Sequence, residues 1–130
     1  MKKTIKFDVT SWEPAVYDEV PDSATLSRAT VRKSFSGDLE GESTAEGLFC
    51  QCADGSASYV GLERVAGKMG EREGTFVMQH GGIIKDGAPV NQFGDIIPGS
   101  GTGDFSGIGG TLRFQHDETG AFIHMDVDFE

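Results

Sequence analysis

Six of the twelve residues from 99 to 110 are glycine, and they stand directly before a stretch that alternates apolar and polar residues. Glycine at this density lets the backbone turn sharply and pass close to a neighbouring strand, as a sheet corner or a barrel rim requires. The residues that follow, Thr111–His116, have the two-residue period of a β-strand. The segment therefore predicts a bend in a β-sheet.

A phosphate-binding loop is the competing interpretation of the same glycines. Gly101–Ser106 has the residue classes of a dinucleotide-binding fingerprint without its last glycine. That fingerprint needs a helix directly after the glycines, so that the helix N-terminus meets the pyrophosphate. A strand is predicted here instead, and no lysine followed by Ser or Thr completes a P-loop. We therefore expect no nucleotide and no other cofactor.

Length and charge limit the class of protein and its partners. The chain has 130 residues, with 11 basic and 21 acidic side chains and a formal net charge of −10. This length predicts a single domain, residues 1–130, with enough core to fold without disulfides or a metal. The negative charge repels nucleic acid and anionic lipid, so we expect neither nucleic acid nor a membrane as a partner.

The N-terminus and the cysteines favour a cytoplasmic protein. No apolar run follows Lys2 and Lys3, as a secretory signal would require, and no segment approaches the roughly 20 apolar residues of a membrane span. Cys50 and Cys52 stand two residues apart in a predicted strand, where side chains point the same way, and this geometry disfavours a disulfide between them. We expect buried thiols and no metal site, because further ligands at a set spacing are not visible.

Apolar alternation recurs between turn signals along the whole chain and predicts an all-β protein. The predicted strands are Thr4–Trp12, Ala24–Phe35, Leu39–Cys52, Ala57–Val65, Arg72–Ile84, Val90–Ile97, Thr111–His116 and Ala121–Phe129. Pro14 and Pro21 predict an irregular acidic link after the first strand. Short turns between the strands predict an eight-stranded antiparallel up-and-down β-barrel, which is just wide enough to be filled by side chains or to hold one small ligand.

The register of two hairpins can be predicted, because a one-residue slip would turn every side chain to the other face. A turn over residues 117–120 pairs His116 with Ala121 and Phe114 with Ile123, and it places His124 on the face opposite to His116. The polar face of this hairpin, with Arg113, is expected to be solvated.

A second hairpin turns near residues 36–38. Pairing Phe35 with Leu39 also sets Arg28 opposite Glu46, and opposed charges favour that register. This register turns Lys33 to the apolar face. We expect Lys33 at the barrel rim, where its stem lets the ammonium group reach water; the alternative is a cation that faces the interior.

Four segments resemble the bacterial domain-of-unknown-function 3224 family, and the resemblance covers almost the whole chain. They are Thr10–Trp12, Phe35–Gly41, Gly55–Val65 and Phe76–Gly82. The resemblance implies an eight-stranded barrel of the allene oxide cyclase type and implies no settled activity. More distantly, Gly99–Gly107 resembles the Gly-Thr-Gly-x-Phe-x-Gly segment of allene oxide cyclase and dirigent barrels. That resemblance carries no catalytic residue to this chain, and fold alone does not transfer function.

The candidate site lies on two neighbouring predicted strands. Alternation places Glu63 and Arg64 on opposite faces, and Glu63 shares its face with Tyr59, so we expect Glu63 inside the barrel. His80 on the next strand is also expected to point inward. The candidate ligand-binding residues are Glu63, His80, Tyr59, Met78, Phe76 and Lys33. A buried carboxylate beside an imidazole has the chemistry of a general acid and base, so Glu63 and His80 are the catalytic candidates; the alternative is a pair that bonds only to each other or to water.

Three functions stay open at this point. The barrel binds a small apolar molecule in its lumen, held by Glu63, His80 or Lys33; or it is an isomerase or cyclase that uses Glu63 and His80; or it is a filled barrel with a structural or assembly role. Trp12 is expected to cover the barrel end or to pack against a partner. We expect a homodimer.

Overall fold

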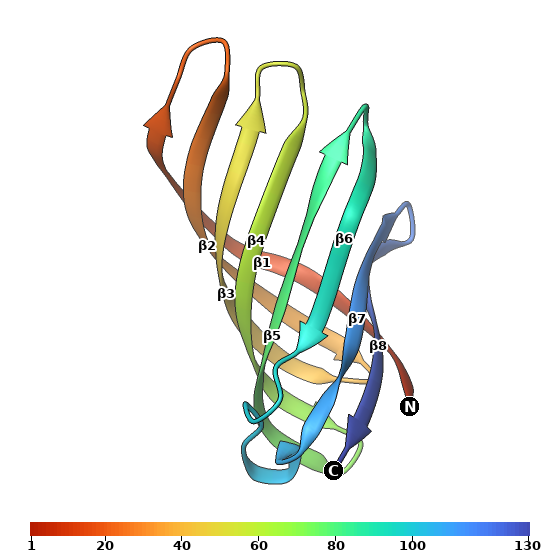
Figure 1. Cartoon of the computed structure of the whole chain (residues 1–130). Helices are drawn as coiled ribbons and strands as arrows, with labels where there is room; N and C mark the ends of the chain where they lie inside the picture. The colour runs from red at the N-terminus through yellow and green to blue at the C-terminus, as the bar shows by residue number, and fades with distance from the viewer.

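Eight antiparallel strands form a closed barrel in chain order, β1 to β8, in a computed structural model that describes residues 1–130 (Figure 1). The elements are β1 (Lys2–Glu19), β2 (Ala24–Gly37), β3 (Glu40–Cys52), β4 (Ala57–Met69), β5 (Arg72–Lys85), β6 (Ala88–Ile96), the short 3-10 helix η1 (Gly103–Phe105), β7 (Ile108–Asp117) and β8 (Gly120–Phe129). The predicted all-β class with eight strands is confirmed. No helix here has the length and apolar character to cross a membrane.

One end of the barrel, the packed end, is filled by side chains. Fifteen buried apolar residues form one cluster there, and Leu39, Met69 and Phe105 come from the turns and strand ends that close it. The rings of Phe76 and Phe105 meet edge to face, with 5.3 Å between their centroids. Burial of each such side chain stabilises the fold by roughly 1.5–3 kcal/mol, so the packed end supplies most of the apolar stabilisation.

The glycine-rich segment lies at the packed end as the connection from β6 to β7 and contains η1. Thr102 donates its amide hydrogen to the carbonyl of Thr75 on β5 at 2.8 Å. A Cβ atom on Gly74 would lie 2.1 Å from the carbonyl oxygen of Thr102, so only glycine lets the two backbones approach this closely. The predicted bend at a barrel rim is confirmed.

At the opposite end, the open end, the barrel wall is incomplete. The hairpins β1–β2, β3–β4 and β5–β6 extend well beyond the tip of β7–β8 (Figure 1). β1 pairs with β8 only as far as Phe7, and β6 pairs with β7 only through Asp95 and Ile96. The outer parts of β1 and β6 are therefore free edges on either side of the β7–β8 hairpin.

The long β1 corrects the prediction of an irregular link after Trp12. The strand continues through Pro14, which pairs with Ala29 of β2, and ends at Glu19. Proline is tolerated on an edge strand, because its missing N–H group is not needed for a second neighbour. Irregularities between Val9 and Ser11 and after Val16 interrupt the register, as β-bulges do.

The two predicted registers have different outcomes. The β7–β8 register is confirmed, with Phe114 opposite Ile123. The β2–β3 register is wrong by two residues, because Phe35 pairs with Gly41 and the fully buried Leu39 packs into the core beyond the turn. A shift of two leaves every side chain on its predicted face. Arg28 and Glu46 still form an ion pair, at 3.0 Å from Nε to Oε2, although they meet diagonally.

Candidate functional site

A cavity of about 1010 Å3 opens at the open end, enclosed by the outer halves of the strands. We call it the cup. Its lining includes Trp12 of β1, Phe49 of β3, Tyr59 of β4, Ile84 of β5, and Phe114 and His116 of β7. The ring of Trp12 meets Phe49 edge-on at 5.1 Å, and Phe49 stacks on Tyr59 at 5.7 Å, centroid to centroid. The cup wall is therefore largely aromatic.

Small inward-facing residues create the space at the base of the cup. Ala29, Gly47 and Gly61 pair in one row across β2, β3 and β4, and the next residue in that row is His80 of β5. Because three of these four positions carry a methyl group or no side chain, the imidazole of His80 enters the lumen without a bulky neighbour in its row. The polar floor of the cup is built around it.

That floor is a cluster of four polar side chains, Lys33, Ser43, Glu63 and His80, each of them buried. Glu63 has no exposed surface and accepts three hydrogen bonds. The donors are Lys33 Nζ at 3.0 Å, Ser43 Oγ at 2.5 Å and His80 Nε2 at 2.8 Å. Charge-assisted bonds of this kind offset much of the cost of burying a carboxylate.

Tyr59 connects this floor to the cup. Its hydroxyl group lies 2.8 Å from Nδ1 of His80. The Glu63 carboxylate already balances the charge of Lys33, so we assign His80 as a neutral imidazole. Its Nε2 then donates to the Glu63 carboxylate, and the lone pair on Nδ1 accepts the hydroxyl hydrogen of Tyr59. The bonds form a chain from Tyr59 through His80 to Glu63, and Tyr59 is the member that lines the cup.

The charges of Lys33 and Glu63 in the floor cancel each other, so the floor is neutral when His80 is neutral. Burial raises the pKa of Glu63, but the hydrogen bond from His80, the charge of Lys33 and the hydrogen bond from Ser43 outweigh burial, and the net pKa lies below its usual value. Glu63 is therefore ionised and neutralises the cation of Lys33, which also lies 4.8 Å from the ring centroids of Phe7 and Phe114.

Tyr59 keeps its proton at neutral pH. Burial, and to a smaller extent the negative charge of Glu63, raise the pKa of Tyr59 to about 12. Its hydroxyl group is thus a neutral hydrogen-bonding group and not a phenolate.

The structure brings together four of the six predicted ligand-binding residues, namely Glu63, His80, Tyr59 and Lys33. Phe76 and Met78 also point inward, but both belong to the cluster of the packed end and do not line the cup.

The expectation that Lys33 sits at the rim is wrong. This side chain is only 8% exposed and faces the interior, where the carboxylate of Glu63 replaces water as its partner. Sequence reasoning missed the role of Ser43 as well. The available signal was a hydroxyl side chain on an inner face otherwise made of Gly41, Ala45 and Gly47.

The other predicted polar residues lie apart from this cluster. His116 contacts Phe7, with 5.6 Å between ring centroids, whereas His124 bonds to Gln115 at 2.7 Å, so the two histidines face opposite ways as predicted. Cys50 and Cys52 are free and only partly buried, with 3.9 Å between their sulfur atoms. They are less buried than predicted, because they alternate with the inward-facing Phe49 and therefore lie on the outer face of β3.

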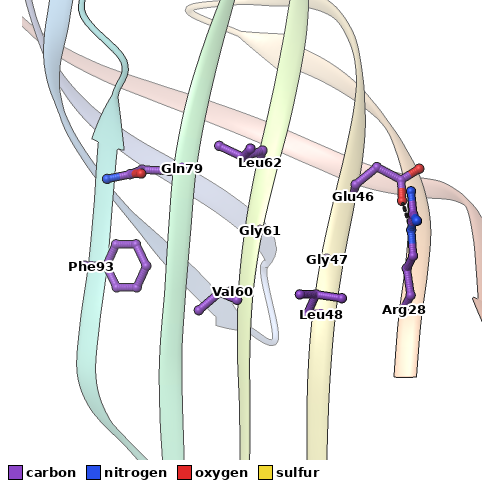
Figure 2. Close-up of a pocket in the computed structure, with 9 residues that line it drawn as sticks. All are labelled: Arg28, Glu46, Gly47, Leu48, Val60, Gly61, Leu62, Gln79 and Phe93. Atoms are coloured by element: carbon purple, nitrogen blue, oxygen red, sulfur yellow. Dashed lines mark hydrogen bonds and ion pairs between the residues drawn. The ribbon is translucent and has the colours of Figure 1, made fainter. Parts of the chain in front are cut away.

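A second apolar surface lies on the outside of the barrel, which we call the convex face. A groove of about 480 Å3 runs over β3 to β6, and Figure 2 shows Leu48, Val60, Leu62 and Phe93 beside it. Four apolar side chains of this groove are between 44% and 56% exposed: Leu48, Val60, Leu62 and Phe93. The Arg28–Glu46 ion pair lies at one side of the groove. An exposed apolar group of this size marks a surface suited to an interaction.

Comparisons with known proteins give a family and a fold. The family model described as "Protein of unknown function (DUF3224)" matches residues 3–129. A crystal structure of a protein with unknown function from the same family, from Shewanella oneidensis MR-1, is 36% identical, has a TM-score of 0.91, and is matched over 100% of this chain and 97% of that chain. No curated protein matches this sequence.

Proposed function

Because the chain belongs to the DUF3224 family, as its motifs predicted, and the family is one of unknown function, we propose a function from the site itself. The protein binds a small, mostly apolar molecule in the cup, and the polar end of that molecule meets the hydroxyl group of Tyr59. Glu63, His80 and Lys33 hold Tyr59 in place from below.

One observation carries this proposal: the large side chains that fill the packed end stop at the polar cluster, and above it the lumen is a cavity of about 1010 Å3. Ligand sites are typically concave and mostly apolar, with a few placed polar groups. Trp12, Phe49 and Phe114 supply the apolar walls, and Tyr59 supplies a polar group whose orientation is fixed by His80. A molecule with one polar end matches this distribution.

The single tryptophan gives a direct test, because Trp12 lines the cup and is 51% exposed. We would titrate the protein with small aromatic molecules and follow the emission of Trp12. Binding in the cup is expected to shift this emission to shorter wavelength, and Phe49→Ala is expected to weaken binding. Leu48→Ala, on the convex face and outside the cup lining, is the control. Equal weakening by the two variants would place the ligand elsewhere.

An isomerase or cyclase activity is the second candidate, and the bonded chain from Tyr59 to Glu63 favours it. All three donors around Glu63 and both nitrogens of His80 are engaged within the cluster. Acid–base chemistry on a bound molecule would therefore pass through Tyr59, with His80 and Glu63 behind it. In a turnover assay on any molecule found to bind, Tyr59→Phe is expected to abolish conversion and to leave binding; unchanged conversion would remove this candidate.

We also propose that two copies of the chain associate through the convex face. Its four exposed apolar side chains lie on one side of the sheet, and sheets pack face to face at about 10 Å. The face carries the neutral Arg28–Glu46 pair, whereas the whole chain has a net charge of −10, so like-charged copies meet least repulsion there.

Sedimentation tests the homodimer. Leu62→Glu is expected to give monomers, and Val20→Glu, at the exposed β1–β2 tip, is expected to leave the dimer intact. A wild-type protein that sediments as a monomer at high concentration would overturn the proposal. A cytoplasmic location belongs to the same set of proposals, and cell fractionation tests it.

A further inference from the structure

We infer that the ligand of the cup carries a weakly acidic hydroxyl group, as phenols and enols do, and that Tyr59 passes the proton of this hydroxyl to His80. The inference rests on the proposed function of the cup and names the class of molecule that the cup would hold. It follows from the direction of the hydrogen bonds on the cup floor.

The hydroxyl hydrogen of Tyr59 is already committed. It points to Nδ1 of His80 at 2.8 Å, because in the neutral imidazole the single N–H group is on Nε2 and donates to Glu63. The Tyr59 oxygen therefore offers lone pairs to the cup and needs a donor from the ligand. A ligand carbonyl would have to break the bond between Tyr59 and His80, whereas a ligand hydroxyl extends the chain by one bond.

Proton transfer along this chain balances. The O–H bond of the ligand breaks and leaves its electron pair on the ligand oxygen, while a new O–H bond forms on Tyr59. The original O–H bond of Tyr59 breaks as an N–H bond forms at Nδ1 of His80. The products are a ligand anion, a neutral Tyr59 and an imidazolium ion held by Glu63. No oxidant, metal or further reactant takes part.

The charges of the cluster favour transfer of the ligand proton to His80. Before the transfer, Glu63 and Lys33 neutralise each other, so the cluster has no net charge. After it, His80 adds one positive charge that lies one residue away from the ligand anion. The cluster is buried, and opposite charges attract more strongly there than in water. Because the pKa of Tyr59 is raised to about 12, this residue relays the proton and does not keep the negative charge.

Other charged or titratable groups face the same region from three strands. Lys33 of β2 is part of the floor, Cys50 of β3 lines the cup, and Arg113 and His116 of β7 line its opposite side. Arg113 and Tyr59 also share a side pocket of about 130 Å3 between β6 and β7. Arg113 pairs with His124 on the outer face of β7 and is exposed, so water screens its charge, and the lining residues of β1 and β6 carry no charge.

The walls fit a planar molecule. Trp12, Phe49 and Tyr59 form a continuous row of ring contacts beside the Tyr59 hydroxyl, with centroid distances of 5.1 and 5.7 Å. Aromatic rings pack well against other flat conjugated groups. Conjugation is also what makes a hydroxyl weakly acidic, so wall and floor select the same class of molecule.

Two probes of nearly equal size test the inference. Para-nitrophenol has an acidic hydroxyl and a visibly absorbing anion, and para-nitroanisole has a methyl ether in its place. We expect both to change the emission of Trp12. We expect bound para-nitrophenol to ionise with an apparent pKa lower than in water by about one unit or more, the size of effect that one nearby opposite charge produces. Absorbance of the nitrophenolate measures this shift.

Heteronuclear NMR supplies an independent readout. The chain has three histidines, so the ring signals of His80 can be assigned with few variants. Binding of para-nitrophenol is expected to protonate Nδ1 of His80, and binding of para-nitroanisole is expected to leave it unprotonated. Both measurements use the wild-type protein and therefore do not depend on the folding of any variant.

Substitution of Tyr59 adds a third arm. Tyr59→Phe keeps the ring and removes the relaying hydroxyl, so para-nitrophenol should still bind but ionise as it does in water. Tyr17→Phe, at the other tyrosine, which is exposed and outside the cup, should leave the shift unchanged.

The outcomes separate the two proposals. If neither probe binds in the cup, the proposed function fails. If both bind but para-nitrophenol keeps its pKa and His80 stays neutral, the cup is a binding site and the proton relay is wrong. A persistent shift in Tyr59→Phe would also overturn the relay.

Discussion

The two ends of this barrel are built from the same strands and differ in what those strands turn inward. At the packed end, fifteen buried apolar residues form one cluster, whereas at the open end only Ala29, Val31 and Ala45 form a buried cluster, beneath Phe49. Alternation along a strand sets which side chains point inward, but their size sets whether the lumen is filled. Stability and a ligand site are thus separated along the barrel axis, with the polar cluster of Glu63 at the boundary.

The largest expected effect tests the packed end against the open end. Phe76→Ala removes a fully buried ring, so the free energy of unfolding should fall by about 3–5 kcal/mol. Phe49→Ala removes a ring that borders the cup, and its loss should be less than half as large. Urea denaturation of both variants measures the difference. Equal losses would mean that the open end is packed as tightly as the other end.

The boundary is tested by Glu63→Gln, which leaves the buried cation of Lys33 without its anion. Removal of one partner of a buried ion pair costs about 3–5 kcal/mol, so a loss near this range is expected at neutral pH. Glu46→Gln disrupts the exposed pair with Arg28 and should change the stability little. Similar effects of the two substitutions would show that Glu63 is solvated in the native protein.

The same variant gives a dependence on pH with a definite sign. The folded-state pKa of Glu63 lies below its ordinary value of 4.5, so its stabilising contribution is complete above pH 4.5 and is lost as the pH falls through the lowered folded-state pKa. Wild-type protein and Glu63→Gln should therefore converge in stability on acidification below this value. A constant difference between them down to acid pH would contradict the lowered pKa.

A smaller loss of stability is expected from substitution of Tyr59, which connects the polar cluster to the cup. Tyr59→Phe removes one hydrogen bond to His80, and such a bond contributes about 0.5–1.5 kcal/mol to stability. Tyr17→Phe is the control and should not alter the unfolding midpoint. A loss as large as that of Glu63→Gln would assign Tyr59 to the structural core and not to the cup.

The smallest effect compares two inward-facing valines. Val9 is 52% exposed, because β1 has already left β8 at this point, so Val9→Ala should change the free energy of unfolding by no more than about 0.5 kcal/mol. Val65 is fully buried at the packed end, and Val65→Ala should cost clearly more. Thermal unfolding of the pair measures how incomplete the wall is.

Most of the fold follows from local patterns in the sequence. Alternation identified all eight strands, and the turn residues at 117–120 set the register of the last hairpin. The same reasoning ended β1 too early. Proline marks the end of a strand only where that strand has hydrogen-bonded neighbours on both sides, and Pro14 lies on an edge. This reasoning also paired Phe35 with Leu39, two residues before its true partner Gly41. Registers that differ by two residues put the same side chains on each face, so alternation does not distinguish them. Only the burial of Leu39 in the core decides between them.

The candidate site could be predicted only in part. Inward positions for Tyr59, Glu63 and His80 follow from the two-residue period. The bonds of Glu63 to Lys33 and Ser43 depend on how strands 20 and 30 residues away are staggered around the barrel, and a sequence pattern does not report that stagger. For the same reason, the sequence predicted that Phe76 points into the barrel, but not that it lies in the packed end and away from the cup.

The free outer part of β1 has a consequence for solubility. An unpaired strand edge of this length offers its N–H and C=O groups to any other extended chain and is a common start of aggregation. Pro14 removes one donor from this edge, the irregularities at Val9 and Val16 interrupt its flat geometry, and Asp18 and Glu19 add negative charge near its end. We conclude that the barrel can leave its wall open beside the cup because the sequence of β1 makes that edge a poor template for further strands.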